Sequence, residues 1–292
     1  MTLQNILRVS LWLLAVLMAV LLYAQGGAPN AYEAKVSQFG WVLRYGMHAA
    51  FFALAAWISV SDFITKSVTI LQAILPLVLV LTLFAIAPES NIPITISQFH
   101  QGIPAWLALE WGMVSTTTAE ASSLSVVFDA LAVLALLLMV VPHWDYLWNA
   151  MAQYSAKRCV RYFRAHFRSL WRAFHWPIVG VLGAVLLVYI WGGSHWLSFR
   201  SALWSAVFCG GFLWLLGSCM TLYLRQQALG SSDPILFAAI GAMVGAQGAF
   251  LSLIAMLGTG FLCALGFRIV KGEPTSPLLP SLCMGAIFII FT

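Results

Sequence analysis

Asp233 is the residue at which a chemical function can first be sought. It heads the segment Gly230 to Gly248, GSSDPILFAAIGAMVGAQG, where a short polar turn meets an apolar run punctuated by glycines. No other carboxylate lies between Asp145 and Glu273. A carboxylate at the edge of hydrocarbon is costly and often marks a functional site, but an aspartate before a helix is also a common N-cap. The residue types alone leave both interpretations open.

The composition predicts an all-α, polytopic membrane protein. The 292 residues are 62% hydrophobic and 8% charged, which is more apolar surface than a soluble core can hide. A membrane-spanning helix needs about 20 apolar residues, and stretches of this kind predict about eight spans. These stretches are Leu7 to Ala24, Trp41 to Val60, Val68 to Ala87, Leu124 to Pro142, Pro177 to Trp191, Ala202 to Leu224, Ile235 to Phe267 and Leu278 to Phe291. The stretch from Ile235 to Phe267 fits either one steeply tilted helix or two halves broken near Gly245 and Gly248.

Orientation follows from the distribution of Lys and Arg. Residues 88–124 contain neither, whereas residues 143–176 contain six. The positive-inside rule therefore predicts that the second loop and the amino terminus are cytoplasmic. Asp62 and Asp233 then fall at the cytoplasmic boundary, and Asp129 lies near the outer end of its span. The first apolar stretch also fits a signal peptide, but its length favours a retained anchor.

Residues 150–175 predict a basic amphipathic helix at the membrane surface. Arginines recur there every three or four residues, and Val160, Phe163, Phe167, Trp171 and Phe174 follow the opposite face. Such a helix is expected to lie on an anionic inner leaflet, or to dock an acidic cytoplasmic partner. The net charge of +5 is explained by this arrangement, so no nucleic-acid partner is expected. The arginines are Arg158, Arg161, Arg164, Arg168 and Arg172.

The remaining polar residues favour structural roles. The five cysteines are scattered and form no CxxC pair, so neither a metal site nor a disulfide framework is expected, and no cofactor is implied. A lone histidine, His48, is expected to be a hydrogen-bonded structural residue. Asp62 is expected to cap the helix that follows it, with Lys66 four residues on. Asp129 is expected to bond a hydroxyl or backbone group across a helix interface.

Residues 177–292 resemble a known family. The successive segments HWPIVGVLGAVLLVYIWGG, LWSAVFCGGFLWLL, GSSDPILFAAIGAMVGAQG and SPLLPSLCMGA are similar in order and spacing to the carboxy-terminal half of type IV prepilin peptidases. These are GxGD intramembrane aspartyl proteases of bacterial pilus and type II secretion systems. Gly230 matches the first motif glycine and Asp233 the second catalytic aspartate, while Gly241 and Gly245 fall in the helix that follows. The resemblance implies an inner-membrane protein with pilin-like or single-span partners.

The match to this family is degenerate. Its chemistry needs two carboxylates around one water, one ionised and one protonated. Here Ser232 replaces the second motif glycine, Ile235 replaces the motif lysine, and the position of the first catalytic aspartate falls near Arg164. The paired cysteines of the family's zinc module are also absent.

Two functions remain. The favoured hypothesis is a peptidase-derived membrane subunit without catalysis, which acts as a scaffold in a pilus, secretion or other membrane assembly. The alternative is an active endopeptidase that cleaves leader peptides at the cytoplasmic face with Asp233 and a substitute carboxylate, either Asp145 or Asp62. Three regions are predicted: an amino-terminal membrane region over residues 1–149 with about four spans and no assigned family, the basic helix over 150–175, and the peptidase-like region over 176–292.

Overall fold

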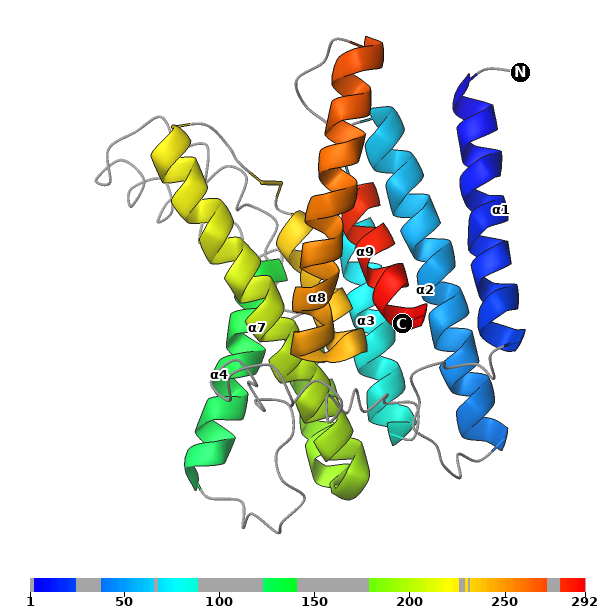
Figure 1. The fold of residues 1–292 in the computed structure, drawn as a ribbon. Helices are drawn as coiled ribbons and strands as arrows, with labels where there is room; N and C mark the ends of the chain where they lie inside the picture. Colours follow the sequence, from blue (N-terminus) through cyan, green and yellow to red (C-terminus); the bar gives the residue numbers. More distant parts are fainter. Residues whose placement is uncertain are drawn as a thin grey trace, which may run out of the picture.

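The computed structural model describes residues 3–24, 38–65, 68–88, 123–140, 179–225, 229–230, 232–271 and 279–291. These residues form a bundle of helices (Figure 1) and contain no strand, so the all-α prediction is confirmed for this part of the chain. Every apolar stretch identified in the sequence coincides with a helix. The helices are α1 (Leu3–Ala24), α2 (Gln38–Thr65), α3 (Ile70–Ile86), α4 (Ser123–Val140), a helix over Val179–Trp191, α7 (Gly193–Leu224), α8 (Ser232–Lys271) and α9 (Leu279–Phe291).

Two helical segments in the described ranges are long and apolar enough to cross a membrane. They are Tyr45–Thr65 within α2 and Gly193–Leu224, which is the whole of α7. The other apolar helical segments are shorter. The total of about eight spans therefore stays a prediction.

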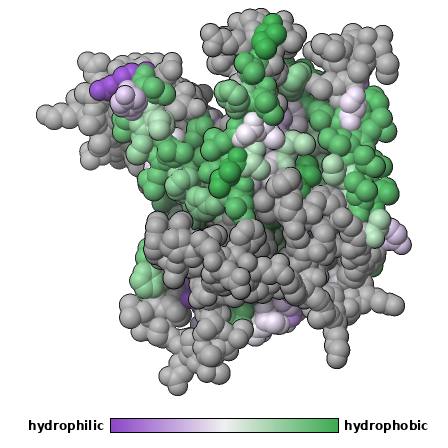
Figure 2. Space-filling model, viewed as in Figure 1, coloured by the Kyte–Doolittle hydropathy of each residue, from purple (hydrophilic) through white to green (hydrophobic). Residues whose placement is uncertain are grey.

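The first half of α8 is the centre of the bundle. No hydrophobic side chain between Ile235 and Val244 is more than 3% exposed, because α3, α7 and other helices surround this half. A helix that is apolar all round, as ILFAAIGAMV is, is expected to be buried in this way. The outer faces of the bundle are also apolar, and Figure 2 shows hydrophobic side chains over most of the described surface on one face.

Helix α8 is broken at Gly245. The backbone there has φ 77° and ψ 163°, which is outside the helical region and is accessible almost solely to glycine. In Figure 1 the chain turns at the lower end of α8, and the second half of the helix rises to the top of the bundle. Of the two alternatives for this stretch, two halves are therefore correct, and Gly245 is the position of the break.

Small residues allow the central helices to approach closely. A Cβ atom added to Gly241 of α8 would lie 2.6 Å from Cys209 Sγ and 2.8 Å from the Ser205 carbonyl oxygen, both on α7. Gly285 of α9 meets the backbone of Ser252 in the second half of α8 in the same manner. Crossings of this kind, with small residues at the point of contact, are typical of helices in membranes.

Two helix boundaries change the roles that were predicted for polar residues. Helix α7 begins at Gly193, nine residues before the apolar stretch, and in its first turns His195 bonds α3 and Arg200 bonds α4. Helix α2 continues through Asp62 to Thr65, so the prediction that Asp62 caps the next helix is wrong. Thr69 is the N-cap of α3, and it forms a capping box with Gln72.

Candidate functional site

Asp233 closes the turn that precedes α8. Its Oδ2 atom accepts a hydrogen bond from the Gly230 backbone N–H at 2.9 Å, and its own N–H donates to the Gly230 carbonyl at 3.3 Å. This reciprocal pair resembles the arrangement at a helix amino terminus in which a side chain accepts from a backbone N–H three residues earlier. The carboxylate is buried, and it is positioned by its own turn.

The same turn lies inside the bundle rather than at its edge. The Pro234 carbonyl faces Gly210, near the middle of α7, at a distance that would leave an added Cβ only 3.0 Å away. The Leu229 side chain packs against Gly217, about two turns farther along α7. These two glycines let the turn approach the face of α7, so Asp233 is packed against another helix rather than at the edge of the bundle.

The other motif positions contribute to packing. Ser232 is the first residue of α8 and is half-buried, and Gly241 forms the crossing with α7. Ile235, at the position of the family's lysine, is 1% exposed and belongs to the core. A lysine ammonium group at that position would therefore need a polar partner inside the bundle.

Asp62 lies in a different polar cluster, between α2 and α9. The Ser59 hydroxyl and the Cys283 thiol are hydrogen bonded, and the Asp62 carboxylate is close enough to interact electrostatically with Cys283. On the other side of α2, Ser61 Oγ accepts from Gln72 Nε2 at 2.9 Å, which ties the end of α2 to the start of α3. Ser59 and Cys283 also line a mainly apolar cavity of about 50 Å³ between α1, α2 and α9.

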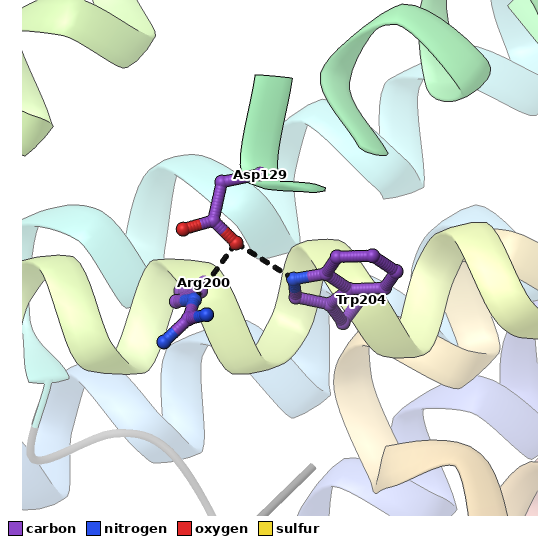
Figure 3. Close-up of polar contacts among 3 residues, drawn as sticks. All are labelled: Asp129, Arg200 and Trp204. Carbon is purple, nitrogen blue, oxygen red and sulfur yellow. Dashed lines mark hydrogen bonds and ion pairs between the residues drawn. The ribbon is translucent and has the colours of Figure 1, made fainter. Parts of the chain in front are cut away.

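A partly buried ion pair joins α4 to α7. Asp129 Oδ1 accepts hydrogen bonds from Arg200 Nε and from Trp204 Nε1, both at 2.8 Å (Figure 3). Arg200 and Trp204 are four residues apart and so share one face of α7. Asp129 is therefore a partner across a helix interface, as predicted, although it bonds a guanidinium and an indole rather than a hydroxyl or backbone group.

This pair lies at the opposite end of α3 from Asp62. His195, near the start of α7, donates from Nδ1 to the Ala85 carbonyl at the carboxyl end of α3 at 2.8 Å, and its ring stacks on Trp191 at 4.2 Å. The Ser61–Gln72 bond marks the amino end of α3. Asp129 and Asp62 are thus separated by the length of α3, as the predicted topology requires.

Several predicted residues lie outside the described ranges. They are the candidate catalytic partner Asp145 and the arginines of the basic helix, Arg158, Arg161, Arg164, Arg168 and Arg172. Among the residues that are described, no group of three His, Cys, Asp or Glu side chains is placed to hold a metal ion.

Arg200 and Trp204 are the polar residues that the sequence interpretation missed. The signal was present, because Arg200 is the only Lys or Arg between Arg172 and Arg225, and Asp129 is an isolated carboxylate in an apolar run. Isolated opposite charges in apolar segments are expected to pair.

Comparisons of the chain with protein-family profiles, with curated proteins and with solved structures found no match.

Proposed function

We propose that the chain is a polytopic membrane protein with about eight spans, and that it serves as a non-catalytic, prepilin-peptidase-like subunit or scaffold in a pilus, secretion or other membrane assembly. The membrane placement is supported by the apolar outer faces of the helices. Leu13 of α1, Leu215 of α7 and Phe261 of α8 are all more than half exposed. Surfaces this apolar require lipid or a protein partner to cover them.

The loss of catalysis is supported chiefly by the hydrogen bond between the Asp233 carboxylate and the Gly230 N–H. An aspartyl protease needs its carboxylate to bind and activate a water together with a second carboxylate. Here the carboxylate stabilises the start of α8, and the position of the motif lysine is a buried isoleucine. Under this proposal the chain keeps a peptidase-like fold but has lost the acid–base chemistry of an aspartyl protease.

Substitutions of Asp233 separate capping from catalysis. Asparagine keeps a side-chain oxygen that accepts from the Gly230 N–H but cannot act as an ionised base, whereas alanine removes the acceptor. We expect Asp233→Asn to unfold at the same temperature as the unsubstituted protein, and Asp233→Ala to lose about 0.5–2 kcal/mol of stability. Thermal unfolding in detergent micelles measures both.

The matching functional assay is cleavage of a co-expressed prepilin leader, followed by immunoblotting. A scaffold leaves the leader uncut in every variant, while a tagged single-span partner co-purifies equally with the unsubstituted protein and with Asp233→Asn. Leader cleavage that Asp233→Asn abolishes would instead support the alternative of an active peptidase. Asp62→Asn and Asp145→Asn would then identify the second carboxylate.

A further inference from the structure

The ion pair between α4 and α7 uses only one N–H donor of the Arg200 guanidinium. A guanidinium carries five N–H donors, and Asp129 accepts from Nε alone. Within the described part of the chain, no bond is formed by either Nη group. The Arg200 side chain is 19% exposed, and neither Nη atom is among the buried, unbonded ones. Figure 3 shows these nitrogens directed away from Asp129 and Trp204, on the side of the guanidinium opposite its bonded edge.

The length of α7 places this edge at the border of the hydrocarbon layer. Residues 201–224 carry no charge and span roughly 36 Å at about 1.5 Å per residue. Since the hydrocarbon core of a bilayer is about 30 Å thick, a tilted α7 puts Arg200 at one border and Arg225 at the other. Tyr189 and Trp196, whose ring centroids are 5.0 Å apart, lie at the Arg200 end with Trp191. Clustered aromatic rings are typical of this level of a membrane.

We propose that Arg200 binds the phosphodiester of a membrane phospholipid through its two Nη groups, with Asp129 and Trp204 as positioning residues. The Nη edge matches two phosphate oxygens, and lipid phosphates lie at the depth where the edge emerges. Asp129 neutralises the guanidinium, so recognition rests on hydrogen bonds to the phosphate that all phospholipids share rather than on the charge of the headgroup. This inference rests on the proposed membrane placement, and it is independent of the proposed loss of peptidase activity.

Native mass spectrometry of the full chain in detergent tests the site. Phosphatidylglycerol, phosphatidylethanolamine and diacylglycerol are added separately, and bound lipid is counted. We expect both phospholipids to bind with similar affinity and diacylglycerol, which lacks the phosphate, to bind at least about tenfold more weakly. Millimolar inorganic phosphate should not displace the phospholipid, which distinguishes a lipid site from a free-phosphate site. Equal binding of diacylglycerol, or displacement by inorganic phosphate, would overturn the proposal.

Three variants assign the effect to Arg200. Arg200→Gln should lower phospholipid binding about tenfold, and the double variant Asp129→Asn with Arg200→Gln should do so as well. The double variant replaces the ion pair with neutral groups that can still hydrogen bond, and therefore keeps the test valid if the single variant is unstable. Asp129→Asn alone leaves the guanidinium charge uncompensated, so it should shift binding toward anionic phosphatidylglycerol. Unchanged binding in the double variant, or unchanged lipid preference in Asp129→Asn, would contradict the assignment.

Arg225→Gln is the matched control, because Arg225 is an exposed arginine at the other end of the same helix. Arg225→Gln should leave phospholipid binding at Arg200 intact. A decrease in binding equal to that of Arg200→Gln would contradict the proposed site. Recovery of the protein in the soluble fraction would refute the membrane placement itself, whereas a membrane-extracted protein that binds no phospholipid would refute this site alone.

Discussion

At the scale of single residues, Asp129 shows how a charge is tolerated between apolar helices. A carboxylate removed from water loses several kcal/mol of hydration, which a single cation repays only with good geometry and additional hydrogen bonds. Asp129 has both, because Arg200 and Trp204 donate to the same oxygen at 2.8 Å. The Trp204 indole therefore stabilises the Asp129 carboxylate through its N–H, in addition to its contribution to the packing of α7.

Trp204→Phe tests the contribution of the indole N–H. The substitution keeps an aromatic ring but removes one of the two donors to Asp129. A hydrogen bond to a charged group contributes about 1.5–3 kcal/mol, and we expect a loss of stability of that order in detergent micelles. Trp196→Phe is the control, since Trp196 also lies on α7 and makes ring contacts with Tyr189 and Phe199, but its indole N–H donates no hydrogen bond among the described residues. Equal losses in the two variants would show that ring packing, not the N–H, is responsible.

The sequence identified the polar residues more reliably than their partners. It predicted that Asp129 bonds across a helix interface, but the apolar stretch of α7 was taken to begin after Arg200, so the partner was left out. It assigned Asp62 a capping role because a polar group follows an apolar run, and the structure gives that role to Thr69. In both cases the error arose because hydropathy ends a helix at a charge, whereas the folded chain continues the helix and pairs the charge.

At the scale of helices, the crossing of α7 and α8 depends on glycines, whose lack of a side chain lets the two backbones approach closely. Gly241 brings the backbone of α8 against Ser205 and Cys209, and Gly210 brings α7 against Ala238 and the Pro234 carbonyl. These two contacts lie about one helical turn apart on each helix. The first half of α8 therefore packs closely against α7 in the turns directly after Asp233. The position of Asp233 is consequently a property of this crossing.

Gly241→Ala should weaken the crossing. The new methyl group would overlap Cys209 Sγ and the Ser205 carbonyl, and overpacking of this kind costs about 1–3 kcal/mol. Gly258→Ala is the control on the same helix, because nothing lies within 4 Å of an added Cβ there. We expect thermal unfolding in micelles to show a loss for Gly241→Ala and none for Gly258→Ala. Adding Cys209→Gly to Gly241→Ala should restore part of the loss, since the Ser205 carbonyl stays in place.

The helices themselves were predictable, but their breaks and the contacts between them were not. Apolar runs of about 20 residues located every described helix to within a few residues at most ends. The break in α8 had two candidates, Gly245 and Gly248, because any glycine permits a positive φ without requiring one. The place of Asp233 inside the bundle was also not predictable, since it depends on Gly210 and Gly217 of another helix.

At the scale of the molecule, the described helices place interhelical polar contacts at two ends, and the side chains buried between these ends are mostly apolar, with Asp233 as an exception. One end carries Asp129, His195 and Arg200, and the other carries Asp62 and Thr69. Helix α3 connects them, as its two terminal hydrogen bonds show. A bundle built in this way is suited to a bilayer, with the Arg200 end predicted to be outside.

Single cysteines at the two ends of α7 test this placement. After replacement of the five native cysteines, Ser194→Cys and Arg225→Cys are introduced separately at exposed positions. Because α7 is expected to cross the bilayer, a membrane-impermeant maleimide should label position 225 in inverted vesicles and position 194 in right-side-out vesicles. Leu229→Cys should react more slowly than Arg225→Cys from the same side, since Leu229 is packed against Gly217. Labelling of positions 194 and 225 from one side would mean that α7 does not cross, and the phospholipid site at Arg200 would then lose its premise as well.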